Sequence, residues 1–338
     1  MFRQRLTQLS ALIALWLFIS GSGNADAQPV ILIDGSSTVY PITKAVADKF
    51  EAAKKNTIKT SVNISGSSGG FRKFCRGEID IVNASRPILK HEIKECKNAR
   101  VQYVEIPVAF DAVTVAINPA NSWTKAMTVA ELKKIWEPAA QGRITRWSQI
   151  NPTWPDESIK LYGADIDSGT YDYFTEAIIG KARSSRTDFT QSENHTTLID
   201  AVAAEKNALG FFNFAYYIEN QDKVAAVAIN NGTGAVLPSV ETVENGSYQP
   251  LSRPIFIYVN IQAAEKTEVK EFVEFYMKNA LLIVKEVKFF SLPPRAYATM
   301  LEHFNKKRVG TVFDGISAVG LTIDDLIRRE GRLEFEHH

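Results

Sequence analysis

The sequence contains few of the residues from which metal sites and covalent catalysts are built. It holds 2 cysteines and 5 histidines in 338 residues, and their positions show no spacing typical of metal ligands. No Gly-x-Ser-x-Gly elbow is followed by an aspartate and a histidine at convincing positions, which argues against a serine hydrolase. His195 falls in a polar stretch and is predicted to face water. We therefore expect no metal, no cofactor and no enzymatic activity.

An excess of charge of either sign is also absent. The chain has 39 basic and 38 acidic residues, which gives a formal net charge of +1. A basic surface for nucleic acid is therefore not expected, and no acidic tail suggests a solvating role. Any anion that this protein binds has to be held by local dipoles and a few well-placed side chains.

Only the N-terminal region carries a long apolar run. Arg3 and Arg5 precede apolar residues 9–19, and small residues follow up to Ala27. This pattern predicts a signal peptide over residues 1–27 that is cleaved after Ala27. The run is short for a membrane span, and no cysteine follows it that could carry a lipid. We expect an exported, soluble protein, with an uncleaved anchor as the alternative.

Cys75 and Cys96 are the only cysteines of the chain. An isolated pair in an oxidising compartment is more often a disulfide than two free thiols. The bridge would close a loop of roughly 20 residues and contribute on the order of 3 kcal/mol in the chain-entropy description. We predict that this disulfide is structural.

Strand and helix patterns alternate from the start of the mature chain. Short apolar runs predict strands, and apolar residues at helical spacing predict an amphipathic helix. The predicted strands cover residues 30–33, 60–64 and 79–82, and the predicted helices cover 42–51 and 71–76. This alternation indicates an α/β fold in which mainly parallel sheets are flanked by helices.

The length of the chain exceeds what one hydrophobic core usually holds, so two lobes are expected. Later elements are predicted at residues 104–117 (a β-prone stretch interrupted by Pro107 and Asp111), 129–136, 208–217, 253–259, 266–279 and 280–287. We predict a discontinuous first lobe, residues 28–110 plus 251–338, and an inserted second lobe, residues 111–250. The two crossings would form a hinge.

Three segments rich in hydroxyls and glycine each precede a predicted helix. They are residues 35–38 (GSST), 66–70 (GSSGG) and 165–170 (DIDSGT). A helix start presents unpaired N–H groups and the positive end of the helix dipole, and glycine lets an anion approach the backbone closely. Each segment alone could simply cap its helix. Together, with the third on the other predicted lobe, they predict a site for a small oxyanion.

Four segments resemble the phosphate-binding proteins of high-affinity phosphate ABC transporters, and the cyanobacterial-type branch most closely. They are residues 34–41 (DGSSTVYP), 66–71 (GSSGGF), 84–87 (ASRP) and 167–171 (DSGTY). The resemblance runs in the same order over nearly the whole mature chain. It implies a two-lobed periplasmic binding protein of the type II fold, with phosphate in the interlobe cleft. It also implies delivery to the membrane subunits of a transporter, and we expect a monomer.

The resemblance implies a set of phosphate contacts at the matching motif positions. These are Thr38 and Ser67 from the first lobe, Ser168, Gly169 and Thr170 from the second, and Ser37 as a further donor. Two positions depart from the enterobacterial branch: Arg86 replaces an aspartate, and Ala164 stands where that branch carries an arginine. We predict that Arg86 supplies the guanidinium to phosphate. The alternative is that Arg86 forms a surface or interlobe salt bridge.

Selectivity for phosphate needs a hydrogen-bond acceptor. Monohydrogen phosphate carries a proton and sulfate does not, so a carboxylate in the site would favour phosphate. Asp111 at the predicted hinge is our first choice for this role, ahead of Asp167 and Asp34. Alternatives to phosphate binding are another oxyanion such as sulfate, a phosphorylated solute, a signalling role, or weak extracellular phosphatase activity through Ser67 or Ser168.

Overall fold

The computed structural model describes residues 28–316 and 319–332. The signal peptide predicted over residues 1–27, with its cleavage after Ala27, lies outside the described residues. Within the part of the chain that is described, no helix combines the length and the apolar character that a membrane crossing requires.

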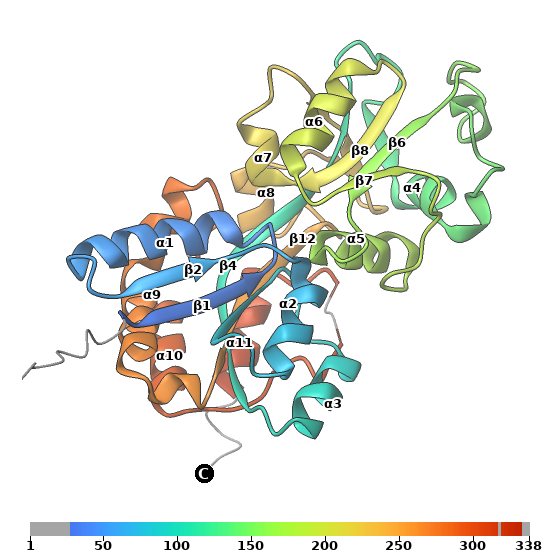
Figure 1. Cartoon of the computed structure of the whole chain (residues 1–338). Coiled ribbons are helices and arrows are strands. Elements are labelled where there is room, and N and C mark those ends of the chain that lie inside the picture. Colours follow the sequence, from blue (N-terminus) through green and yellow to red (C-terminus); the bar gives the residue numbers. More distant parts are fainter. Residues whose placement is uncertain (1–27, 317–318, 333–338) are drawn as a thin grey trace, which may run out of the picture.

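The first lobe contains both ends of the described chain (Figure 1). Its N-terminal part alternates strands and helices in the order β1 (Val30–Gly35), α1 (Tyr40–Ala53), β2 (Lys59–Val62), α2 (Gly66–Cys75), β3 (Ile81–Ala84) and α3 (Lys90–Asn98). Strands β1, β2 and β3 pair in parallel, with β1 in the middle. The chain then returns to this lobe with a 3-10 turn (Ala263–Glu265), α9 (Thr267–Glu286), α10 (Pro294–Asn305) and α11 (Ile323–Arg332).

The second lobe lies in the middle of the sequence. Its elements are β5 (Ala126–Thr128), α4 (Val129–Trp136), β6 (Lys160–Ala164), α5 (Gly169–Ile179), β7 (Thr190–Ser192), α6 (His195–Ala204), β8 (Ala208–Asn213), α7 (Phe214–Ile218), β9 (Ala225–Ala226), β10 (Ala228–Asn230), β11 (Ala235–Val236) and α8 (Val240–Glu244), with 3-10 turns at Pro138–Ala140 and Trp147–Gln149. Strands β7, β6 and β8 are parallel. The two-lobed α/β architecture is therefore confirmed.

Two long strands connect the lobes, β4 (Tyr103–Ile117) and β12 (Ser252–Asn260) (Figure 1). They are antiparallel, and they join both sets of strands in the order β2-β1-β3-β12-β4-β8-β6-β7. Along β4 the partner changes from β12 to β8 between Ala112 and Val113. The lobe boundaries at 110/111 and 250/251 stay a prediction, and this exchange of partners lies two residues from the first of them.

Three predicted elements differ from the structure. Helix α2 begins at Gly66, five residues earlier than predicted, so the GSSGG segment forms its first turns. Pro107 does not interrupt β4, because it sits opposite Phe256 where the register shifts by a bulge, a place that tolerates a missing N–H. The two helices predicted at 266–287 form a single helix, α9, because its buried apolar face continues through Ala280.

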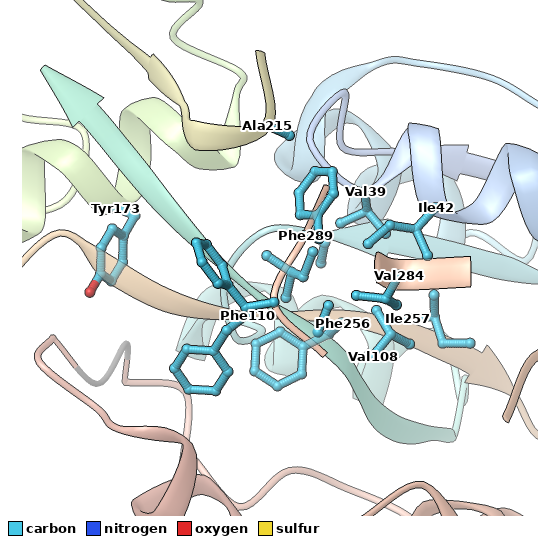
Figure 2. Packing of buried hydrophobic residues seen from close by; sticks show 14 of the residues in the cluster. Val39, Ile42, Val108, Phe110, Tyr173, Ala215, Phe256, Ile257, Val284 and Phe289 are labelled. Carbon is cyan, nitrogen blue, oxygen red and sulfur yellow. The ribbon is translucent and has the colours of Figure 1, made fainter. Parts of the chain in front are cut away.

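The hydrophobic core is continuous beneath the crossing strands. Figure 2 shows Phe110 of β4 beside Phe256 of β12, with Phe289 and Val39 close to them. All of these side chains are buried. At the far side of the first lobe, Cys75 of α2 and Cys96 of α3 form the predicted disulfide. The core therefore joins the start of α1 to the two crossing strands.

Candidate functional site

The three hydroxyl-rich segments meet where the lobes touch. The hydroxyl oxygens of Thr38 and Thr170 lie 3.0 Å apart, although the two residues come from different lobes. Ser67 Oγ accepts a hydrogen bond from the backbone N–H of Ser85 (3.0 Å) and lies 3.3 Å from the Ser85 hydroxyl. These four side chains are buried. The structure thus brings together the donors that the sequence predicted from both lobes.

The first turn of α5 is built for close approach to the first lobe. Ser168 caps the helix, its hydroxyl accepting from the Thr170 N–H at 3.1 Å. A Cβ on Gly169 would lie 2.3 Å from Ser85 Oγ and 2.4 Å from Ser67 Oγ. A Cβ at that distance would force both serine side chains to move, so glycine lets the start of α5 reach these hydroxyls as they stand.

A buried arginine that the sequence analysis missed lies at the centre of the site. Arg253 of β12 stands directly opposite Asp111 of β4, and its Nη2 donates to Asp111 Oδ2 at 3.0 Å. The same guanidinium donates to the Gly169 carbonyl oxygen (2.7 Å) and to Thr170 Oγ1 (2.8 Å), and it lies 3.4 Å from Thr38 Oγ1. One cation therefore contacts residues from both lobes.

The charges of this pair nearly cancel. Burial raises the pKa of Asp111 to about 6, and the neighbouring Arg253 opposes the increase. Burial also lowers the pKa of Arg253, which Asp111 opposes in turn. The site therefore offers one compensated guanidinium and several neutral hydroxyl donors. Such a set can hold a small oxyanion without a large net positive charge.

Arg86 is not available as a free donor, contrary to our prediction for it. Its Nε donates to Asp172 (2.7 Å), and its two Nη groups donate to Glu92 (2.8 Å each), Ser68 Oγ and the Pro87 carbonyl oxygen. All five N–H groups of the guanidinium are thus occupied. Because Asp172 belongs to α5, Arg86 forms an interlobe salt bridge, which was the alternative interpretation.

The three carboxylates considered as acceptors all have partners. Asp34 accepts from the Gly35 N–H, the Ser65 hydroxyl and Lys73. Asp167 lies at the partly exposed rim and pairs with Arg72 and Arg183 at 3.3 and 3.2 Å. Asp111 is held by Arg253. The structure places Asp111 inside the site, and Asp34 and Asp167 at its edges.

His195 is buried, so the prediction that it faces water was wrong. It is the first residue of α6, and its ring stacks on the ring of Tyr216 with 5.0 Å between the ring centroids. Its Nε2 lies 3.5 Å from Ser37 Oγ. Burial lowers its pKa to about 3, so the ring is neutral. Its Nδ1 has no hydrogen-bond partner among the described residues. Among the described residues, the Ser37–His195 contact therefore lacks the third member of a catalytic triad, the acidic residue that orients the histidine.

Among the described residues, no group of three or more histidine, cysteine, aspartate or glutamate side chains could hold a metal ion. The candidate site is accordingly made of hydroxyls, a backbone carbonyl and one ion pair. The only sequence signal for Arg253 is its position at the start of a predicted strand; that it faces Asp111 follows from the register of β4 and β12.

Known proteins resemble this chain over most of its length. A family profile described as a PBP superfamily domain matches residues 21–280. Protein SphX of Synechocystis is 48% identical over 321 residues, covering 95% of each chain. Phosphate-binding protein PstS of Staphylococcus aureus is 33% identical over 286 residues, covering 83% of this chain and 84% of PstS. The chain belongs to the PstS/SphX family of phosphate-binding proteins.

Solved structures share the fold of this PstS/SphX family member. A possible phosphate-binding protein from Planctomyces limnophilus is 46% identical, with a TM-score of 0.63 over 82% of this chain and 98% of its own. A putative phosphate ABC transporter substrate-binding protein from Clostridium perfringens, solved with bound phosphate, is 26% identical, with a TM-score of 0.65 over 78% of this chain and 100% of its own. The fold is that of the two-lobed periplasmic binding proteins, which are solute-binding proteins rather than a class of enzymes.

Proposed function

We propose that this protein binds inorganic phosphate between its lobes, outside the cytoplasmic membrane, and passes it to the membrane subunits of a phosphate ABC transporter. The observation that carries the proposal is the meeting of donors from both lobes around the Arg253–Asp111 pair. The names of the relatives support it, and so does the bound phosphate of the Clostridium perfringens structure.

The proposed contacts follow from the positions of these donors. Thr38, Ser67, Ser168, Gly169 and Thr170 remain proposed phosphate ligands, Ser37 remains a proposed further donor at their edge, and Arg253 takes the place proposed for Arg86. Phosphate would enter between Thr38 and Thr170 and replace the hydrogen bond that these two hydroxyls now make with each other. A ligand that bridges both lobes favours the closed arrangement.

The remaining expectations from the sequence are part of the proposal. The chain would be exported by a signal peptide over residues 1–27, act as a monomer, bind no nucleic acid and have no enzymatic activity. Among the described residues, no acidic side chain orients His195 through its Nδ1, which supports a binding role over a phosphatase. Ser168 supports it as well, because its hydroxyl is already engaged in capping α5.

The test is a calorimetric titration of the mature protein, stripped of bound ligand, with phosphate and then with sulfate. We expect one-to-one phosphate binding that sulfate does not displace. An absence of any phosphate binding would refute the proposed function, and displacement by sulfate would favour a general oxyanion binder. Release of product from a chromogenic phosphate ester, abolished by Ser67→Ala or Ser168→Ala, would show that the protein is an enzyme.

A further inference from the structure

Glu193 reaches across the interlobe contact. It follows β7 in the second lobe, yet its Oε1 lies 3.2 Å from the position that a Cβ on Gly66 of the first lobe would occupy. The hydroxyl of Ser37 faces the same carboxyl. Gly66 precedes Ser67 and Ser37 precedes Thr38 in the chain. The carboxyl of Glu193 is therefore set between the two first-lobe segments that carry the proposed phosphate donors.

This carboxyl is buried without a cation. Neither oxygen is accessible to water, and neither has a hydrogen-bond partner of normal geometry among the described residues. The charged groups that act on it most strongly are the aspartates Asp165, Asp167 and Asp172. Arg72 and Arg183 pair with Asp167, and Arg86 pairs with Asp172. Burial raises the pKa of Glu193 to about 7, the Ser37 hydroxyl opposes the increase, and the three aspartates add to it.

A buried carboxyl with no cation carries unused hydrogen-bonding capacity, which costs free energy unless a ligand takes it up. Three nearby carboxyls, those of Asp111, Asp172 and Asp34, are each held by an arginine or a lysine. Asp165 also lacks a counter-ion, but its Oδ1 accepts from the Asp167 N–H. Among the described residues that face the donor segments, Glu193 is thus the carboxyl with neither a counter-ion nor a hydrogen-bond partner on either oxygen. An ionised carboxylate in that position can accept a hydrogen bond from a ligand that carries a proton.

We propose that Glu193 accepts the proton of monohydrogen phosphate and excludes oxyanions that carry no proton; this deepens the proposed function and rests on it. In the phosphate complex, one proton is shared between a phosphate oxygen and the Glu193 carboxylate, and no proton needs to be taken from water. In a sulfate complex, two anionic groups would face each other until the carboxyl takes up a proton from solution. Selectivity for phosphate over sulfate therefore depends on whether the oxyanion carries a proton.

The direct test compares the parent protein with Glu193→Gln at about pH 8, where free phosphate is mainly the monohydrogen form and a solvated carboxyl is ionised. The glutamine is uncharged and can donate to either anion. We expect the ratio of phosphate to sulfate affinity to fall at least about tenfold, with sulfate binding gained and phosphate binding weakened. Glu205→Gln, an exposed glutamate of the same lobe, is the matched control and should leave the ratio unchanged.

The outcomes separate the two proposals. A parent protein that binds no phosphate would refute the proposed function, and this inference with it. A Glu193→Gln protein that binds phosphate and rejects sulfate as strongly as the parent would overturn the role of Glu193 alone. A loss of phosphate affinity without any gain in sulfate affinity would also overturn it, because the exclusion of unprotonated oxyanions would then have another cause.

A second measurement needs no variant and covers the case in which Glu193→Gln does not fold. In the parent protein, sulfate affinity should rise by up to about tenfold for each unit that the pH falls between about 9 and 7, because the complex takes up one proton. Phosphate affinity should stay nearly constant between about pH 9 and 7.5, because its complex takes up none. Equal slopes for the two anions would contradict the proposal.

Discussion

At the level of single residues, two buried arginines of this protein differ in the number of carboxylates that bind them. Arg86 is bound by two carboxylates, Glu92 and Asp172, so its charge is more than compensated. Burial lowers the pKa of Arg86, but the two carboxylates outweigh it and the pKa is raised. Arg253 has one carboxylate, Asp111, and spends its remaining donors on hydroxyls and a carbonyl. Arg253 therefore has positive charge left for an anion, whereas the charge of Arg86 is already taken up by two carboxylates.

Replacing Arg253 by glutamine should therefore weaken phosphate binding by at least about 30-fold, since truncating one side of a buried charged contact costs about 2–5 kcal/mol. The single change would also leave Asp111 buried without its cation and lower the stability. The double variant Arg253→Gln, Asp111→Asn removes both charges. It should recover much of the thermal stability but not the affinity, as titration and thermal unfolding would show.

Two outcomes would contradict this assignment. Phosphate binding by the double variant at the affinity of the parent would place the anion elsewhere. An Arg86→Gln variant that loses affinity while Arg253→Gln retains it would restore Arg86 as the phosphate ligand. Both comparisons use proteins whose unfolding transitions have first been shown to be cooperative.

The sequence predicted the residue types of the site better than their partners. The three segments were recognised because hydroxyls and glycines at a helix start form a local pattern. The family resemblance then implied Thr38, Ser67 and Thr170 within them. Arg86 was misjudged because its partner Asp172 is far away in the chain and reaches it only across the interlobe contact. The ion pair of Arg253 depends on the register between β4 and β12, which is likewise a long-range property.

At the level of elements, the residues at which α2 and α5 begin determine how closely the two lobes can approach each other. Helix α2 begins at Gly66 although its first five residues, GSSGG, have poor helix propensity, because packing against β1 and β3 outweighs that cost. Helix α5 begins at Gly169, directly against the hydroxyls of the first lobe. The sequence located both segments but treated the first as a turn, since propensity is local and this packing is not.

Gly169→Ala should hinder closure, because the new Cβ would lie 2.3–2.4 Å from the hydroxyl oxygens of Ser85 and Ser67. We expect phosphate affinity to fall about tenfold or more, which corresponds to roughly 1.4 kcal/mol or more. Each lobe should keep its own fold, since the contact lies between lobes. Titration, with thermal unfolding beside it, would measure both effects.

The matched control for this change is Gly331→Ala in α11, where an added Cβ meets nothing within 4 Å. That substitution should leave binding unchanged and stabilise the helix by up to about 1 kcal/mol. If Gly169→Ala bound phosphate as well as Gly331→Ala does, then the close approach of α5 to the first lobe would not be needed for binding.

For the whole molecule, the length of the chain was enough to predict two lobes, and the alternation of strands and helices was enough to predict an α/β fold. The contact between the lobes could not be predicted, because it depends on side chains that no local pattern connects. It contains the Arg86–Asp172 pair, and Arg183 of the second lobe donates to Ser68 of the first at 2.9 Å. At the rim, Arg72 of the first lobe pairs with Asp167 of the second.

These polar contacts should hold the lobes together in part before phosphate arrives. Asp172→Asn tests this cleanly, because Arg86 keeps its two hydrogen bonds to Glu92 within the first lobe and no buried cation is left unpaired. Without the salt bridge between the lobes, the free protein should open, and its radius of gyration in small-angle X-ray scattering should increase. Phosphate affinity should fall about tenfold, since apparent affinity scales with the population competent to bind.

Arg76→Gln provides the comparison for this last variant, because the pair between Arg76 and Glu78 lies within the first lobe and is exposed. It should change neither the radius of gyration nor the affinity, as expected for a surface ion pair. If Asp172→Asn bound phosphate more weakly at an unchanged radius of gyration, Asp172 would act on the anion site directly rather than through closure. If it changed neither, the lobes would be held together by the Arg253 contacts and by phosphate, and the buried Arg86 pair would serve only to satisfy its own charges.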